Sequence, residues 1–206
     1  MTVKRTGLNF LRWGLVAAFI LVGSWSALAA LTGAIFTTNM NGAFVNGNVY
    51  DRFEDVYLNG GPRPNAPCTA AGLPDGDYYF QVTDPSGKVL LSSDHPVTNR
   101  KVTVSGGVIV AYNGTHINGV GKCSSITIQL SPYAKTPNPG AEYKVWMTRV
   151  QDYDTTATLG SFGFIPSKTK TDNFKVIRNV DSDKDGIPDD TDACPLDPDP
   201  GCGIVG

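Results

Sequence analysis

The feature that most constrains the fold is a series of short β-rich runs separated by turn residues, which begins at about residue 35. Runs of about five to eight residues bounded by Gly, Pro, Asn and Asp are typical of strands, and helix signals are absent here. The runs include VYDRFEDVYLNG, GDYYFQVT, KVTVSGGVIVAY, SSITIQL and AEYKVWMTRV. About six or seven such strands predict an all-β fold, an antiparallel β-sandwich.

Alternation of large apolar side chains predicts which strand faces form the core. Two sets of three residues each share one face of their strand: Tyr78, Phe80 and Val82, and Tyr143, Val145 and Met147. In a sandwich these two faces are expected to meet.

Trp146 falls on the opposite face of its strand, beside Lys144 and Thr148. If this face is open to solvent, the indole could contact a sugar or a protein. The alternative is that residues 157–178 cover this face, as in sheets that are packed on both sides.

The first residues have the composition of an export signal. MTVKRTGLNFLR carries three basic residues and precedes the apolar run WGLVAAFILVG, which is followed by SWSALAA. A basic head, a short apolar core and an A-x-A site predict a secretory signal peptide over residues 1–29, cleaved after Ala29. The alternative is an uncleaved anchor, because residues 13–36 carry no charge and are long enough to span a bilayer. The chain is therefore expected to be secreted or displayed at the cell surface.

The cysteines fit an exported protein. All four lie beyond the predicted signal peptide: Cys68, Cys123, Cys194 and Cys202. An even number of cysteines in an exported chain favours disulfides over metal thiolates or free thiols. Four cysteines allow three pairings. We expect Cys68 to pair with Cys123 in the body of the chain, and Cys194 with Cys202 around the acidic tail.

The charge is unevenly divided along the chain. Residues 181–200 hold eight aspartates and one lysine, whereas residues 31–180 hold thirteen basic and eleven acidic side chains. The body therefore lacks the basic stripe expected of a nucleic-acid-binding protein.

Motifs for catalysis are absent from the sequence. It has no Gly-x-Ser-x-Gly elbow, no His-Glu-x-x-His helix and no glycine-rich phosphate loop. Its two histidines, His95 in SSDHPVTN and His116 in NGTHINGVGK, lie in turn-like stretches and are expected in surface loops. We therefore do not expect an enzyme.

Three segments carry a resemblance to known proteins: LPDGDYYFQVTDPSGKVLLSSD, KVTVSGGVIV and NPGAEYKVWMTRV. Together they resemble secreted bacterial proteins with a prealbumin-like or Ig-like sandwich, related in shape to carboxypeptidase regulatory-like and collagen-adhesin B-type modules. The resemblance covers residues 34–152 and implies a fold and a location outside the cytoplasm more than an activity. Residues 153–180 are predicted to be a linker with one edge strand.

The acidic tail has the spacing of a calcium loop. Gly186 takes the sixth position, where an EF-hand-type loop turns sharply. Positions 1, 3, 5, 7, 9 and 12 fall on Asp181, Asp183, Asp185, Ile187, Asp189 and Asp192. Calcium binds six to eight oxygens, and its charge would relieve the repulsion among these carboxylates. The sequence therefore predicts that this loop binds Ca²⁺, with Ile187 contributing its backbone carbonyl.

The residues after the loop exclude an EF-hand's second helix, because Cys194-Pro195 and DPDPGC follow directly. The pattern D-x-D-x-D-G-x-x-D-x-x-D-x-C-P instead resembles the thrombospondin type 3 repeat, a calcium-wrapped and disulfide-tied segment. This resemblance implies that the aspartates among the six positions bind the ions and that residues 181–206 form one such repeat.

These observations predict an exported, non-enzymatic surface or matrix protein with a structural or adhesive role. Its expected partners are calcium and an extracellular matrix protein, a cell-surface protein or a glycan. The alternative is a carbohydrate- or small-ligand-binding module that uses an exposed aromatic face around Trp146.

Overall fold

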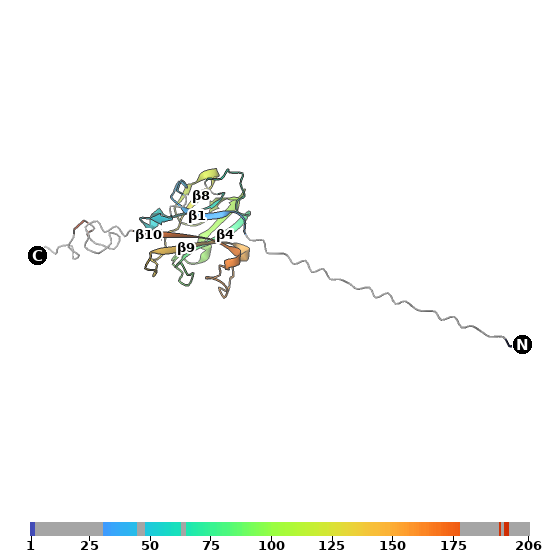
Figure 1. Ribbon diagram of the computed structural model, residues 1–206. Helices are drawn as coiled ribbons and strands as arrows, with labels where there is room; N and C mark the ends of the chain where they lie inside the picture. The colour runs from blue at the N-terminus through green and yellow to red at the C-terminus, as the bar shows by residue number, and fades with distance from the viewer. Residues whose placement is uncertain (3–30, 45–47, 63–64, 178–193, 195, 198–206) are drawn as a thin grey trace.

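The predicted all-β architecture is confirmed by a computed structural model, which describes residues 1–2, 31–44, 48–62, 65–177, 194 and 196–197 (Figure 1). Its ten strands are β1 (Ala34–Thr38), β2 (Val49–Tyr50), β3 (Tyr57–Gly61), β4 (Gly76–Thr83), β5 (Lys101–Ser105), β6 (Val108–Tyr112), β7 (Asn118–Val120), β8 (Ile126–Gln129), β9 (Glu142–Arg149) and β10 (Thr169–Val176). Five short 3-10 helices join them: η1 (Phe53–Asp55), η2 (Val97–Arg100), η3 (Lys122–Ser124), η4 (Val150–Asp152) and η5 (Pro166–Lys168).

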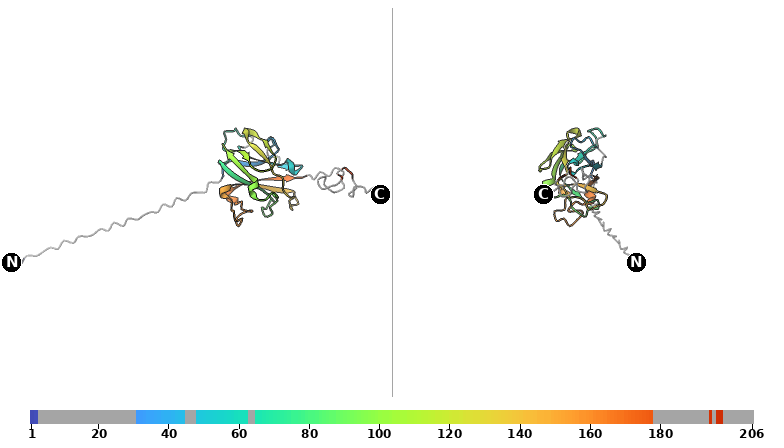
Figure 2. Two further views of the ribbon diagram at one scale, coloured as in Figure 1. Left: turned by 180° about the vertical axis from the view of Figure 1, so that it is seen from behind. Right: turned by 90° about the vertical axis from the view of Figure 1, so that its left-hand side faces the viewer.

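The strands form two sheets that face each other. One sheet has the order β1-β3-β8-β7, and the other has the order β2-β10-β9-β4-β5-β6. All pairings are antiparallel except that of β2 with β10, which is parallel. Figure 2 shows the same strands from behind and after a quarter turn.

The core lies between the sheets and contains the residues that alternation selected. Both predicted sets are almost completely buried: Tyr78, Phe80, Val82, Tyr143, Val145 and Met147. The two sets do not face each other across the sandwich, because β4 and β9 are neighbours in the same sheet and their inner faces lie side by side. The four-stranded sheet contributes Leu58 and Ile128 to the same cluster. Burial of this apolar surface is the main force that holds the two layers together.

The hairpin between β5 and β6 shows why glycine is needed at its turn. Gly106 and Gly107 connect the two strands with φ angles of +60° and +85°. Both values lie in the left-handed region that glycine adopts without steric cost.

The C-terminal boundary of the sandwich differs from the predicted one. The sequence predicts that the sandwich ends at residue 152 and that residues 153–180 form a linker with one edge strand. Instead β10 is an interior strand, which pairs with β9 over seven residues and with β2 on its other side. Its Phe174 and Val176 enter the core, so the sandwich extends to Val176.

Candidate functional site

The strongest site predicted from the sequence lies outside the described residues. This holds for the six calcium-loop positions, Asp181, Asp183, Asp185, Ile187, Asp189 and Asp192, and also for Cys202 and for residues 3–29 of the predicted signal peptide. Within the described part of the chain, no group of three or more His, Cys, Asp or Glu side chains is placed to hold one metal ion. That part also contains no helix long and apolar enough to cross a membrane.

The predicted disulfide of the body is present. Cys68 and Cys123 are bonded across a sequence separation of 55 residues and join the loop after β3 to η3. Close by, Lys122 donates a hydrogen bond to the carbonyl of Ala66. The long loop between β3 and β4 is thereby tied to the turn that precedes β8.

Trp146 does not form an exposed aromatic face. The expectation of a solvent-open indole that could contact a sugar or a protein is therefore wrong. The Trp146 side chain is on the outer face of β9, but it is only 5% exposed, and its Nε1 donates to Thr83 Oγ1 at 2.8 Å. The connection between β9 and β10 covers this face, where Gln81 Nε2 donates to the carbonyl of Ser161. Tyr153 in that connection also packs against Phe164, which is fully buried. A carbohydrate- or small-ligand-binding module built around Trp146 is therefore not supported.

A charged cluster lies where η2 meets the loop between β6 and β7. The guanidinium of Arg100 is almost fully buried and donates to Asp94 Oδ1 at 2.7 Å and to the Phe80 carbonyl at 2.9 Å. His116, which is 6% exposed, places Nε2 2.9 Å from Asp94 Oδ2 and Nδ1 2.6 Å from the Gln129 carbonyl. Asp94 therefore bridges a buried arginine and a buried histidine.

The electrostatics of this cluster favour an ionised Asp94. Burial raises the pKa of Asp94, but the hydrogen bond from His116 and the charge of Arg100 outweigh it, so the pKa lies below its usual value. Both ring nitrogens of His116 face oxygen acceptors inside the protein, so neither is directed at a substrate. The arrangement therefore fixes η2 against the middle of β4 and the loop after β6 against the end of β8.

The two histidines have different outcomes. His95 is exposed, as expected for a surface loop. The same expectation is wrong for His116, which is buried because its ring satisfies two acceptors and packs edge-on against Phe80 at 5.6 Å. Sequence reasoning missed the cluster because its members come from separate turns, and no fixed spacing links Asp94, Arg100 and His116.

A broad open groove of about 760 Å³ runs beside the edge of the four-stranded sheet. It is lined by Asn39, Met40, Asn41, Glu54, Asp55, Tyr57, Asn118, Gly119 and Val120. Met40 and Val120 are 49% and 71% exposed, so the groove presents apolar surface to solvent. The asparagine-rich stretch after β1 thus contributes Asn39 and Asn41 to one wall, beside two carboxylates of η1.

A second depression, of about 370 Å³, lies at the end of the six-stranded sheet where β10 finishes. Its lining includes Lys144, Asn173 and Lys175. Lys175 Nζ lies 3.1 Å from Glu142 Oε1, and Lys144 Nζ lies 5.3 Å from the ring centre of Trp146. Both lysines are therefore already engaged within the sheet.

Comparison of the chain with known proteins gives no match among family models, curated proteins or solved structures.

Proposed function

We propose that this chain is an exported surface or matrix protein that acts by interaction and not by turnover, with a C-terminal tail stiffened by calcium. The observation that carries the proposal is the Cys68–Cys123 disulfide within a β-sandwich. Stable disulfides form in oxidising compartments and are rare in the cytosol, which agrees with the signal-peptide pattern of residues 1–29.

The use of the buried charged groups also supports an interaction role. Asp94, Arg100 and His116 satisfy one another and nearby backbone carbonyls. A catalytic base instead needs to lie within hydrogen-bond reach of a substrate proton. What the body offers to a partner is therefore its open surface, above all the groove beside β7.

The calcium proposal rests on the sequence of the tail. Five aspartates alternate around Gly186 in the spacing of a calcium loop. Extracellular modules with such loops bind calcium at about 10⁻⁴–10⁻³ M, which is within the range of exterior calcium. Bound ions would stiffen a tail that otherwise carries strongly repelling charges.

Calcium titration of the purified chain by calorimetry tests the proposal. We expect saturable binding of about one ion, abolished by the double substitution D183A/D185A, because each of these carboxylates supplies a ligand. The matched control is S182A/K184A in the two intervening positions, which should bind calcium as the wild type does. No heat of binding up to several millimolar calcium would reduce the tail to an acidic spacer.

A further inference from the structure

The outer side of β7 is an open strand edge. Gln129 N donates to the Ile117 carbonyl at 2.8 Å, and Gly121 N donates to the Ser125 carbonyl at 2.7 Å. In an antiparallel pair only alternate residues bond to the neighbouring strand. The N–H and C=O groups of Asn118 and Val120 therefore point away from β8, on the side where no strand of the described residues pairs with β7.

The other edges of the two sheets offer less. The Thr37 N–H on the free side of β1 donates to Asp172 Oδ2 at 2.7 Å, so β10 closes that edge. At the end of the other sheet β2 is only two residues long. The edge strand β6 is interrupted by a β-bulge in its pairing with β5 at Thr103 and Val104. Proteins commonly cover or shorten strand edges, so an uncovered one beside a groove is a candidate docking site.

The groove described above borders this open edge along all three residues of β7. The loop after β1 packs closely over the strand, because Thr127 Oγ1 donates to the Met40 carbonyl at 2.5 Å and a Cβ on Gly119 would overlap that oxygen. The edge is therefore held in place by its neighbours. An extended segment bonded to β7 would direct alternate side chains towards the groove.

Charge indicates what such a segment would carry. Glu54 and Asp55 line the groove, and no basic residue is among the described residues that line it. Arg52 is 3.6 Å from Glu54 in a solvent-exposed pair. Two carboxylates beside one guanidinium leave this rim with a net negative charge. With Met40 and Val120 presenting apolar surface, the complementary ligand has alternating apolar and basic residues.

We propose that β7 and the adjoining groove bind an extended segment of a partner protein with alternating apolar and Lys or Arg side chains, which adds to the sheet as an extra strand. This inference names the surface through which the proposed interaction role acts, and it rests on that role. Backbone hydrogen bonds to Asn118 and Val120 supply affinity, while Glu54 and Asp55 select for basic side chains.

The test uses two blocked synthetic peptides, TKVKVKT and its counterpart TEVEVET, titrated into the full chain. We expect only the lysine peptide to bind saturably, with amide chemical-shift changes centred on residues 117–121. V120P should weaken binding by about tenfold, because it removes one outward N–H donor. It costs no bond to β8, and proline is tolerated on strand edges. The matched control V120A keeps the N–H and should retain binding to within a few-fold.

E54Q/D55N should remove the preference for the lysine peptide over the glutamate peptide. Three results would each overturn the inference. The first is that neither peptide binds, and the second is that the chemical-shift changes lie elsewhere on the molecule. The third is that no peptide binds while the chain forms a dimer that V120P dissociates, because β7 would then pair with a second copy of the chain. The shift map of the wild-type chain remains decisive even if V120P fails to fold. Repeating the titration with D183A/D185A separates this result from the calcium proposal, because none of the described residues that line the groove belongs to the tail.

Discussion

Arg100 is a charged side chain that lies almost completely inside the protein, so the fold has to provide acceptors for its N–H groups. It is 1% exposed, and a buried guanidinium is destabilising unless its donors are paired. Its Nε bonds to the Phe80 carbonyl, and its Nη1 bonds to both the carbonyl and the carboxylate of Asp94. Asp94 in turn accepts from His116, so a single carboxylate offsets two buried basic groups.

We therefore expect D94A to lower the free energy of unfolding by about 3 kcal/mol, because removing one partner of a buried ion pair leaves the other charge uncompensated. The measurement is urea denaturation at pH 7. H95A, at the exposed neighbouring histidine, is the control and should change stability by less than about 0.5 kcal/mol. Equal effects of the two substitutions would show that the cluster does not stabilise the fold.

The same carboxylate predicts a pH dependence. The folded-state pKa of Asp94 is lowered, so its contribution to stability is present above the unfolded value of about 3.9 and is lost as the pH falls through the folded pKa. We expect D94N to be less stable than the wild type at pH 7 and the difference to shrink towards pH 2. Denaturation midpoints across this range test the prediction, and a constant difference would contradict it.

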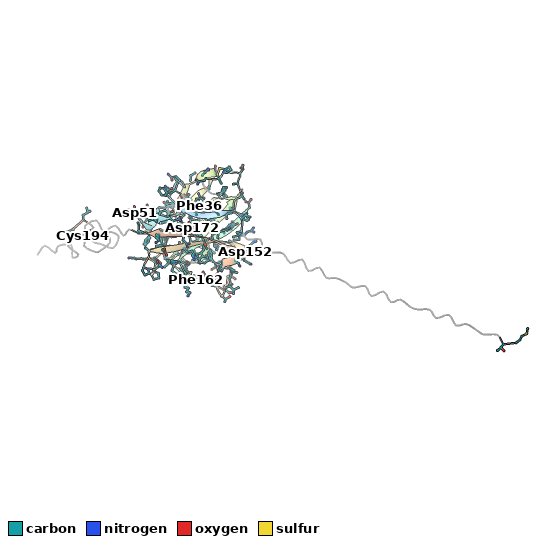
Figure 3. All side chains as sticks on the ribbon, viewed as in Figure 1. Phe36, Asp51, Asp152, Phe162, Asp172 and Cys194 are labelled. Atoms are coloured by element: carbon teal, nitrogen blue, oxygen red, sulfur yellow. A yellow bond between two sulfur atoms is a disulfide. The ribbon has the colours of Figure 1, made fainter. Side chains whose placement is uncertain are left out.

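At the level of strands, the meeting of the two sheets depends on a side chain of β10. Asp172 lies beside the β1 strand that carries Phe36 (Figure 3), and its Oδ2 accepts from both the N–H and the hydroxyl of Thr37. Thr37 is fully buried. A backbone donor at this position cannot turn to water if its acceptor is removed.

We expect D172A to lower the free energy of unfolding by about 1–3 kcal/mol, the usual penalty for a buried donor without a partner. Hydrogen exchange of the Thr37 amide should accelerate by more than the global loss of stability explains. N173A, the next residue on the outward side of β10, is the control and should leave that amide protected. Unchanged protection in D172A would mean that another group satisfies Thr37.

Comparison of the expected strands with the observed ones shows which strands a sequence pattern can predict. The runs around Tyr78–Thr83 and Glu142–Arg149 were long and alternating, and both are buried central strands. The sequence places β10 in a linker with one edge strand, because TKTDNFKV is mostly polar. The structure explains this composition: the outer face of β10 is solvated, and Phe174 and Val176 are its residues in the core. The three-residue β7 is too short to show a period. Its pairing depends on contacts with β8 and the loop after β1, which no local pattern encodes.

At the scale of the whole molecule, the segment between the two bonded cysteines holds much of the sandwich. It includes β4, β5, β6 and β7, so the disulfide closes a loop that contains one half of the six-stranded sheet, β4-β5-β6. In the unfolded chain this cross-link restricts the distance between two points 55 residues apart. By loop-closure entropy, the restriction is worth about 4 kcal/mol.

We therefore expect C68A/C123A to lower the free energy of unfolding by about 4 kcal/mol. In urea denaturation, the midpoint should move to a lower concentration, while the slope of the free energy against urea stays similar or becomes steeper. S124A, beside Cys123 in η3, is the control and keeps the cross-link. A loss below about 1 kcal/mol would mean that other contacts already restrain the loop. The bond from Lys122 to Ala66 is a candidate, because it joins the same two segments as the disulfide, and the bond from Leu73 to Gly107 restrains the same β3–β4 loop against the β5–β6 turn. Those hydrogen bonds are lost when the chain unfolds, whereas the disulfide still restricts the unfolded chain. We therefore expect a loss of about 4 kcal/mol and not one below about 1 kcal/mol.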